Sequence, residues 1–424
     1  KEDALNNKIK WIDVVVCNLY PFSDVINHEE RNQALAMENV DIGGPTMIRA
    51  AAKNVGWVSV VVDSSDYISF AKELESGSIA FKTRKKLATK AFGHTSQYDS
   101  IIYNYLSKDP FPDNLTITYK KHSLLRYGEN PHQTAAAYKI TDDRSSSILN
   151  AKIHQGKPLS YNNIMDADAA LSCLREFDKT ACVIVKHASP CGVAEGERLI
   201  DVYKNAFNAD RLSAFGGIIA LNKKCTEDVA KEIINVFVEI VLAPSFDMGA
   251  LSVFAKKKNL RILEVGRVNR KKNKQEVRNL NGGLLLQDVD TSELNTEELE
   301  TVTECSPSDL DIQNMLFGWK VLKHVKSNAI LLVKDSVTVG IGGGQVSRVD
   351  AVDVAINKSG DNISESILCS DAFFPFRDSI DKISKTGIKA IIQPGGSIKD
   401  GEVISACNEY GIAMVFTKKR CFKH

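Results

Sequence analysis

Apolar runs of strand length alternate with amphipathic stretches over the first hundred residues of the chain. Ile12–Cys17 and Trp57–Val62 are rich in β-branched residues, which predicts two strands. The predicted helices are Thr46–Asn54, with Pro45 at the first helical position, Tyr67–Glu75 and Lys82–Leu106. This alternation is typical of a parallel sheet with crossover helices.

A polar, proline-bearing stretch from Lys108 to Asp113 predicts a domain boundary, and a mixed strand and helix pattern resumes near Thr116. Several later strands end in polar or glycine-bearing loops, where ligands of open α/β sheets gather. Segment 267–281 is strongly charged and is predicted to be solvated, and no repeat of solenoid period is found. The predicted strands are Cys182–Lys186, Gly217–Leu221, Glu239–Ala243, Ala329–Lys334, Val337–Ile341, Ser366–Cys369, Lys389–Gln393 and Ala413–Thr417.

Composition narrows the class of protein. The 424 residues suggest two or three domains, and 54 Lys+Arg against 53 Asp+Glu argue against a nucleic-acid binder held by a bulk basic surface. No apolar run reaches the ~18 residues of a membrane span, and no secretory signal pattern opens the chain. The nine cysteines are scattered and lack a C-x-x-C pair, which favours reduced thiols in a cytoplasmic protein.

Lys186 and His187 form a charged pair directly after the buried run Val183–Val185. Such a pair could supply a base and a proton donor side by side, although a strand end emerging into solvent would look the same. Cys191 after Pro190 resembles half of a nucleobase deaminase zinc signature. The C-x-x-C is missing, and the His-x-Glu at 28–30 lies far upstream, so a deaminase zinc site is not indicated.

Four further loops could carry chemistry. Arg126–Gln133 is polar and aromatic and could grip a phosphate or carboxylate, or be a surface turn. Gly340–Gln345, followed by Ser347 and Arg348, could cradle an anion, or form a hairpin or bulge. Ser370–Asp378 packs three Phe with charges and could stack a flat aromatic ligand, or be a core cluster with an exposed turn.

The fourth loop, Asp41–Thr46, precedes a predicted helix whose N-terminus favours a phosphate. Lys53 lies two turns further along that helix. A capped helix with a solvated lysine would give the same pattern.

Taken together and in this order, these segments resemble the family of bifunctional purine biosynthesis proteins, phosphoribosylaminoimidazolecarboxamide formyltransferase / inosine monophosphate (IMP) cyclohydrolase. The resemblance runs essentially end to end. It implies de novo purine biosynthesis, with formyl transfer from 10-formyltetrahydrofolate to 5-amino-4-imidazolecarboxamide ribonucleotide (AICAR), then cyclisation to IMP. The segments that carry it are 17–22, 41–54, 125–133, 159–163, 185–193, 213–217, 325–328, 340–350, 370–378 and 391–397.

The resemblance also implies an α/β fold and its division. A methylglyoxal-synthase-like cyclohydrolase domain would occupy residues 1–115, and a formyltransferase domain 116–424. The latter would hold two cytidine-deaminase-like subdomains without zinc, at about 116–265 and 266–424. The family pattern places further residues before residue 1, including a phosphate-binding loop, so this cyclohydrolase domain is expected to be partial and ring closure weak or absent.

The resemblance assigns formyl transfer to three residues. His187 would be the base, Lys186 would donate to the oxyanion or the leaving folate nitrogen, and Asn328 would fix the formyl oxygen. The substrate-binding residues would be Arg126, Tyr127, Asn162, Phe215, Gly216, Glu239, Ser347, Arg348, Phe373, Pro375, Asp378 and Arg420. The ring-closing residues would be Tyr20, Asp41, Gly43, Gly44 and Lys53.

The implied partners are small molecules: the nucleotide, and 10-formyltetrahydrofolate as co-substrate. The resemblance implies no zinc, a structural potassium ion near Asp371 and the C-terminus, and a cytoplasmic homodimer with active sites at its interface. Neither a nucleic acid nor a membrane is expected as a partner. Two alternatives stay open at this point: a zinc-free, cytidine-deaminase-like nucleotide-binding protein without turnover, and a deaminase-type zinc enzyme.

Overall fold

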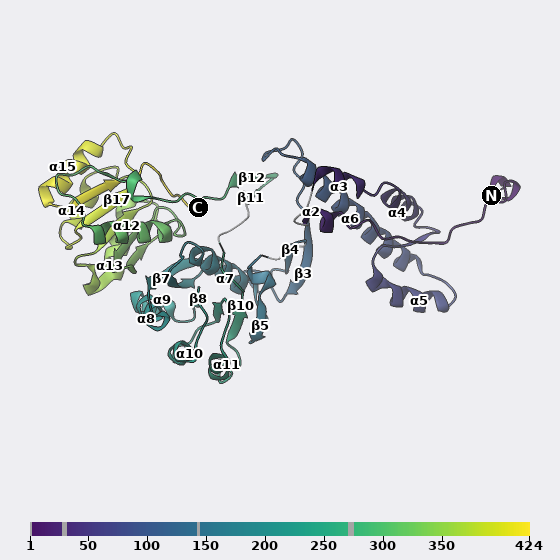
Figure 1. Ribbon diagram of the computed structural model, residues 1–424, viewed down its shortest axis with the longest axis horizontal. Coiled ribbons are helices and arrows are strands. Elements are labelled where there is room, and N and C mark those ends of the chain that lie inside the picture. The colour runs from purple at the N-terminus through teal and green to yellow at the C-terminus, as the bar shows by residue number, and fades with distance from the viewer. Residues whose placement is uncertain (1, 28–31, 142–144, 270–274) are drawn as a thin grey trace. The chain divides into compact units, whose positions relative to one another are not determined.

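The chain divides into two compact units, each described by itself. The computed structural model describes residues 2–27, 32–141, 145–269 and 275–424 (Figure 1). Unit 1 comprises Lys1–Lys120 and Tyr138–Asp143, and unit 2 comprises Lys121–Ala137 and Arg144–His424. The division runs through the two-stranded sheet of β3 (Tyr119–Leu125) and β4 (Ala135–Ile140).

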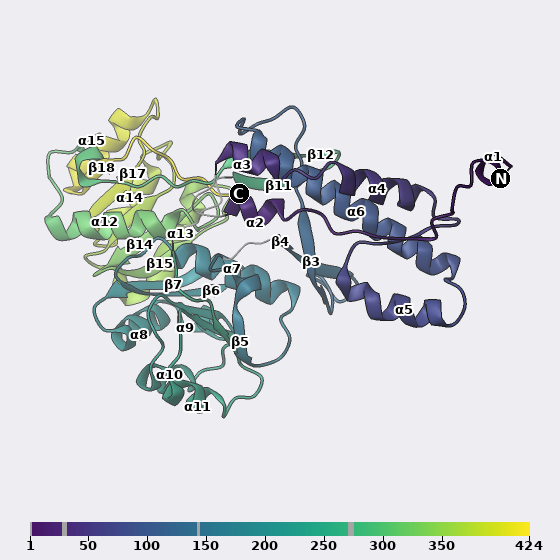
Figure 2. The ribbon, with the colours of Figure 1, turned by 45° about the vertical axis from the view of Figure 1, so that its right-hand side comes forward.

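Unit 1 is built on a small parallel sheet. β1 (Val14–Val16) pairs in parallel with β2 (Ser59–Val61), inside the two predicted strand runs. Helix α4 (Gly43–Lys53) packs its apolar face on β2 and on α6 (Phe81–Leu106), and Figure 2 shows the two helices side by side. The other helical elements are α1 (Glu2–Asn6), α2 (Phe22–Asn27), α3 (Gln33–Glu38), η1 (Ser64–Asp66) and α5 (Tyr67–Glu75).

The start of α4 corrects one prediction. The helix begins at Gly43, so Pro45 is its third residue and not its first. The Asp41 carboxylate accepts the Gly44 N–H at 2.7 Å, which satisfies a donor that the first turn leaves free. Pro45 is tolerated there because first-turn N–H groups have no partner within the helix.

Unit 2 is organised around one mixed twelve-stranded sheet in the described part of the chain. Its order is β13-β18-β17-β16-β14-β15-β7-β6-β8-β9-β10-β5. The first-half strands are β5 (Lys152–Gln155), β6 (Thr180–Lys186), β7 (Ser189–Gly196), β8 (Ile218–Leu221), β9 (Ile240–Ala243) and β10 (Arg261–Glu264). The second-half strands are β13 (Glu300–Thr301), β14 (Ile330–Lys334), β15 (Val337–Gly342), β16 (Ile367–Ser370), β17 (Ala390–Gln393) and β18 (Ala413–Phe416).

Helices cover both faces of this sheet. α7 and α12 share one core with alternate strand residues such as Val183 and Leu331, whereas the intervening residues Ile184 and Leu332 face the other helices. The first-half helices are η2 (Ile148–Asn150), α7 (Tyr161–Leu174), α8 (Leu199–Ala209), α9 (Arg211–Ala214), α10 (Glu227–Ile233) and α11 (Met248–Phe254). The second-half helices are η3 (Thr296–Glu298), α12 (Asp309–Leu322), α13 (Arg348–Ser359), η4 (Gly360–Ile363), α14 (Asp378–Ile383) and α15 (Asp400–Tyr410).

The two halves of unit 2 repeat one pattern. In each half a capped helix leads into an antiparallel hairpin, followed by a helix and then alternating parallel strands and helices. Ser160 and Ser308 both close a capping box at the start of α7 and α12. The halves meet where β7 pairs antiparallel with β15, and the sheet order reads alike outward from that seam.

The predicted strands of unit 2 all lie within a residue or two of observed ones, whereas β7 was missed because Pro190, Gly192 and Gly196 hide its pattern. The segment predicted to be solvated overlaps β11 (Gln275–Leu280), which pairs with β12 (Gly283–Asp288) as an exposed hairpin. Residues 270–274 of that segment lie outside the described residues.

Candidate functional site

Lys186 and His187 lie where β6 turns into β7. Lys186 pairs with Ser189 across the hairpin, and the two central residues, His187 and Ala188, have φ of 51° and 56°. Positive φ at both central positions is the geometry of a type I′ hairpin turn, for which Asn and Gly are preferred. A histidine and an alanine held there cost backbone strain, which is a recognised mark of functional sites.

The turn borders a cavity of about 340 Å³ within unit 2. Residues from both halves line it, so the cavity lies across the seam of the sheet. The lining residues are Lys186, His187, Ser189, Pro190, Cys191, Asp210, Ser213, Val325, Lys326, Ile341, Gly343, Gly344, Val354 and Lys358. The sequence-predicted pair therefore borders a partly open cavity, with Lys186 partly buried and His187 exposed.

Lys186 is held by the segment before β8. Its Nζ donates to the backbone oxygen of Phe215 at 2.8 Å. Gly216 has a φ of 70°, and a Cβ on it would lie 2.9 Å from that Nζ, so a side chain there would displace the ammonium group. The ring of Phe215 is exposed and lies 5.4 Å from the ring of Phe237, which leaves an aromatic surface beside the lysine.

Asn328 is partly buried and belongs to a cluster with the buried residues Arg348 and Asp371. Its Oδ1 accepts from Arg348 Nη2 at 3.0 Å, and its Nδ2 donates to the backbone oxygen of Gln345 at 2.8 Å. Arg348 Nη1 also donates to Asp371, whose carboxylate is fully buried. The amide of Asn328 is thus fixed in orientation, with one N–H still available, two residues from the cavity-lining Lys326.

A charge network joins the two halves at the cavity wall. Lys358 Nζ lies 2.6 Å from Asp210 Oδ2 and 3.0 Å from Ser213 Oγ. Burial would raise the pKa of Asp210, but the hydrogen bonds from Lys358 and Ser213 hold it below its usual value. Burial also raises the pKa of the nearby Cys191 thiol to about 12, so this thiol stays protonated.

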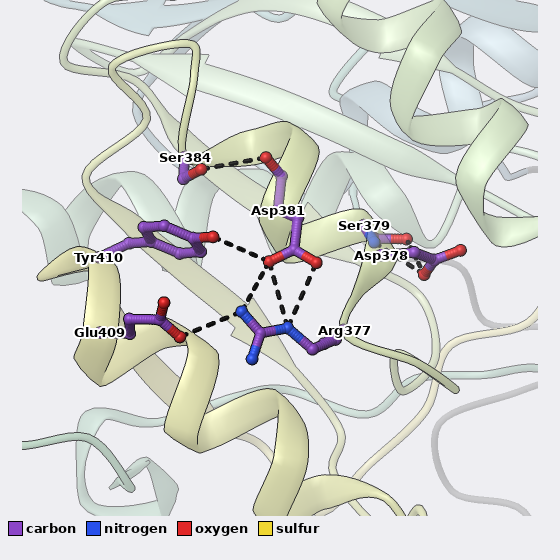
Figure 3. Close-up of polar contacts among 7 residues, drawn as sticks. All are labelled: Arg377, Asp378, Ser379, Asp381, Ser384, Glu409 and Tyr410. Carbon is purple, nitrogen blue, oxygen red and sulfur yellow. Dashed lines mark hydrogen bonds and ion pairs between the residues drawn. The ribbon is translucent and has the colours of Figure 1, made fainter.

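The aromatic loop after β16 is tied to two helices. Phe373 is exposed, whereas Phe374 is buried in the core. Figure 3 shows Arg377 reaching from this loop to Asp381 of α14 at 2.9 Å and to Glu409 of α15 at 3.0 Å. The Asp378 carboxylate, on the first residue of α14, accepts the N–H of the next residue, Ser379, at 2.7 Å.

The remaining predicted substrate-binding residues lie in separate places within unit 2. Arg126 stacks on Tyr127 at 5.6 Å, and Asn162 Nδ2 donates to the backbone oxygen of Glu129 in the same loop at 3.3 Å. Glu239 is paired with Arg261 at 2.7 Å. The other three are Ser347, which caps α13, Pro375 in the aromatic loop, and Arg420, which lies over the ring of Phe422.

In unit 1 the structure brings together some of the predicted ring-closing residues. The Asp41 carboxylate accepts the N–H of Gly44, which follows Gly43, and the N–H of Tyr20. Lys53 is the last residue of α4, about 15 Å along the helix from Gly43, and so lies at the opposite end. Tyr98, whose OH accepts the Asp41 N–H at 2.8 Å, was missed from the sequence because it lies 57 residues away.

Sequence reasoning also missed Asp166, Asp210, Lys326 and Lys358. Ala188 N–H donates to Asp166 Oδ1 at 2.8 Å, and the other three line the cavity. Each lies on a helix, cap or loop whose charges look like ordinary surface positions in the sequence. A signal was present only for Asp210, since Asp followed three residues later by Ser fits a helix cap.

Within the described part of the chain, no three His, Cys, Asp or Glu side chains gather as around a metal ion. His28–Glu30, the His-x-Glu considered as half of a zinc signature, lies outside the described residues. Among the helices that the structure describes, none combines the length and apolar character needed to cross a membrane.

Comparison with known proteins identifies the family. A family model described as AICARFT/IMPCHase bienzyme matches residues 51–358. A protein of Caldicellulosiruptor saccharolyticus named bifunctional purine biosynthesis protein PurH is 49% identical over 98% of this chain and 82% of its own length. Proteins of the same name from Acetivibrio thermocellus and Persephonella marina are 48% and 47% identical, each over 98% of this chain and 82% of their own length. The chain therefore belongs to the AICARFT/IMPCHase bienzyme family.

Proposed function

We propose that this chain works in de novo purine biosynthesis, transferring a formyl group from 10-formyltetrahydrofolate to AICAR in unit 2 and closing the ring to IMP in unit 1. One observation carries the formyl-transfer proposal: Lys186 and His187, on a strained turn, line one cavity with Lys326, two residues from Asn328. The relatives are named as bifunctional enzymes, which gives no support to a nucleotide-binding protein without turnover.

The chemistry explains why these three side chains are needed. The 5-amino group of AICAR is a weak nucleophile, because the imidazole and its carboxamide withdraw the lone pair. A neutral His187 imidazole would take the amine proton as the N–C bond forms. Asn328, through its available N–H, would donate to the formyl oxygen as it becomes an oxyanion, and the Lys186 ammonium would donate to that oxyanion or to the departing folate nitrogen.

The other predicted residues would place the substrates. Arg126, Tyr127, Asn162 and Arg420 would bind the nucleotide, and Glu239 would lie near the carboxamide. Phe215, Gly216 and Phe373 would bound the flat rings, and Pro375 and Arg348 would lie close to the nucleotide and the folate. Ser347 and Asp378 would also bind substrate. The exposure of the Phe215 and Phe373 rings supports this role, because exposed aromatic faces can stack on a ligand. Arg348 would act by holding Asn328.

For ring closure we infer a role for the N-terminal end of α4. Tyr20, Asp41 and Lys53 would handle protons and stabilise the oxyanion, and Gly43 and Gly44 would offer backbone donors. The geometry supports Asp41 and Gly44 directly, since the Gly44 N–H points at this carboxylate. Lys53, at the far end of the helix, would have to act separately from them.

The two compact units support the proposed domain assignment. We infer a methylglyoxal-synthase-like cyclohydrolase domain over residues 1–115 and a formyltransferase domain over 116–424. The repeated pattern in unit 2 supports two cytidine-deaminase-like subdomains, divided near residue 265. We further propose that the protein is a cytoplasmic homodimer with active sites at its interface and that formyl transfer uses no zinc.

A structural potassium ion near Asp371 stays a prediction. The Asp371 carboxylate does not fit as a ligand, because Arg348 and Ser327 donate to its two oxygens. An ion in this region would need other oxygens, such as backbone carbonyls, and no step of the proposed reaction depends on it.

The test of the proposed function replaces the base without disturbing the turn. His187→Asn suits the test because Asn tolerates the left-handed backbone at this position. We expect formyl transfer to fall by about 10²–10⁴-fold, since the amine proton loses its acceptor. The measurement is tetrahydrofolate release from 10-formyltetrahydrofolate in the presence of AICAR.

The matched control lies in the second half of unit 2. Asp335 occupies the corresponding position of the β14–β15 turn, with a φ of 52°. Asp335→Asn should leave the rate within twofold of the unaltered protein. Equal rates for His187→Asn and the unaltered protein would refute the role of His187.

A further inference from the structure

Asp166 lies behind the turn that carries the proposed base. It is the sixth residue of α7 and is partly buried. Its Oδ1 accepts the N–H of Ala188 at 2.8 Å, which secures the second of the two positive-φ residues. Because Asp166 contacts a backbone N–H and not a side chain, no sequence motif could have predicted this contact.

The second half of unit 2 contains the same contact with a different residue. Asn314, the sixth residue of α12, accepts the N–H of Ser336 through its Oδ1, also at 2.8 Å. Ser336 is the second positive-φ residue of the β14–β15 turn, and in both halves the acceptor precedes the donor by 22 residues. An amide oxygen is therefore sufficient to clamp this turn, and the carboxylate of Asp166 adds only its charge.

That charge is placed among groups that the reaction uses. Lys186 and His187 lie on the turn itself, and Asp210, Lys326 and Lys358 line the same cavity from other elements. Asp210 is already paired with Lys358. Among the residues that the structure describes, Asp166 makes no ion pair within 4 Å, so its charge is left for the turn. Burial raises the pKa of Asp166, and the Ala188 N–H and the charges of His187 and Lys186 oppose that rise.

We propose that Asp166 is a positioning residue that clamps the turn and, through its negative charge, favours the protonated form of His187. The inference rests on the proposed role of His187 as the base. When His187 takes the amine proton it becomes a cation, and a carboxylate bonded to the N–H of the next residue, Ala188, stabilises that cation more than an amide would.

Asp166→Asn separates the clamp from the charge. The amide should hold the turn as Asn314 does, so the thermal midpoint should stay within a few degrees of that of the unaltered protein. Without the neighbouring anion, we expect the acidic limb of the kcat–pH profile to move towards lower pH. A weaker base should also lower the kcat plateau, by about threefold to tenfold.

Asn314→Ala is the control for the clamp alone. It removes the acceptor from the corresponding turn, where no proposed catalytic residue lies, so it should lower the thermal midpoint and leave the kcat–pH profile in place. A purely structural Asp166 would give a profile for Asp166→Asn that superimposes on that of the unaltered protein, which would overturn the inference.

The His187→Asn variant distinguishes the two proposals. In that background, Asp166→Asn should cause no further loss of rate, because the charge acts through the imidazole. If His187→Asn is inactive and Asp166→Asn behaves as the unaltered protein, the proposed function stands and this inference falls. If His187→Asn is fully active, the proposed role of His187 falls first.

Discussion

At the scale of single residues, the buried Arg348 holds a neighbouring side chain in place through its hydrogen bonds. Arg348 is 7% exposed, and its guanidinium group donates hydrogen bonds to three acceptors: the Asp371 carboxylate, the Ala329 carbonyl and the Asn328 amide oxygen. Arginine suits this position because its planar group presents several donors in fixed directions. The orientation of Asn328 is thereby set by Arg348.

Arg348→Lys tests this arrangement. An ammonium group cannot reach the three acceptors together, so we expect a loss of about 1–3 kcal/mol in the free energy of unfolding and a fall of at least tenfold in formyl transfer. Urea unfolding and tetrahydrofolate release measure the two effects. For comparison, Arg377→Lys alters a pair that is 42% and 37% exposed, so solvent screens it and we expect a much smaller loss than for Arg348→Lys. Similar losses in the free energy of unfolding for both variants would contradict the claim that the buried Arg348 stabilises the fold more than the exposed Arg377 does.

At the residue scale the sequence predicted groups that stand out against their neighbours. Lys186 and His187 interrupt a β-branched run, so they were visible without a structure. Asp166 and Lys358 were not visible, because a single charge on a helix gives no sign of what it meets across the fold. These two residues could not be predicted because their partners lie far away in the sequence, and not because their chemistry is unusual.

Elements in unit 2 approach one another closely at their glycines. A Cβ on Gly192 of β7 would lie 2.0 Å from the backbone oxygen of Ala206 in α8. A Cβ on Gly340 of β15 would lie 2.2 Å from the backbone oxygen of Ala355 in α13. Each hairpin is therefore covered by the backbone of its helix, which only a residue without a side chain permits.

Gly192→Ala should force α8 away from the hairpin that carries Lys186 and His187. We expect it to destabilise the protein by about 1–3 kcal/mol, as overpacking of a rigid contact does. Gly401→Ala, in α15, meets no atom within 4 Å and should be neutral or stabilise by about 0.5–1 kcal/mol. Thermal unfolding of the two variants gives the comparison, and an unaffected Gly192→Ala would contradict the close packing.

The sequence predicted the buried strands of unit 2 well, because their apolar runs are short and bounded by turns. It missed β7, the buried strand β10, the edge strands β5 and β13, and the two-stranded sheets β3–β4 and β11–β12. β7 carries the glycines that its covering helix requires, and these lower the strand signal in the sequence. The feature that makes the packing possible is thus the one that hides the element.

Across unit 2 as a whole, the two halves are joined by more than the sheet. Glu176, just after α7, lies 2.7 Å from Lys323 Nζ and 3.2 Å from His324 Nε2, both just after α12. The Lys323 side chain is only 6% exposed. Burial would raise the pKa of Glu176, but His324 and Lys323 hold it below its usual value, while burial lowers the pKa of His324.

Both shifts make unit 2 less stable in acid. A folded-state pKa below the unfolded value means that the stabilisation is present above the unfolded pKa and is lost as the pH falls through the folded one. For His324 the loss begins below about pH 6.5, and for Glu176 below about pH 4.3. The free energy of unfolding should therefore decline from pH 7 towards pH 4.

Glu176→Gln should remove about 3–5 kcal/mol at pH 7, because Lys323 is left buried without its anion. The variant should also lose less stability than the unaltered protein below about pH 4, where Glu176 takes up a proton. Urea unfolding at several pH values measures both effects. Glu300→Gln, which alters an exposed pair with Lys418, should change the free energy of unfolding by less than about 1 kcal/mol. A Glu176→Gln loss no larger than that would show that the buried triad does not join the halves.

Because the β6–β7 turn recurs as the β14–β15 turn, the residues at corresponding positions of the two turns can be compared within one molecule. Where the two copies agree, as at Gly192 and Gly340, close packing requires the residue. Where they differ, as at His187 and Asp335, the turn accepts either residue, which is expected if His187 serves the proposed reaction. A histidine introduced at position 335 would therefore lie on a turn that is already held by the contact between the Ser336 N–H and Asn314. The β14–β15 turn thus repeats the backbone geometry of the β6–β7 turn but lacks its histidine.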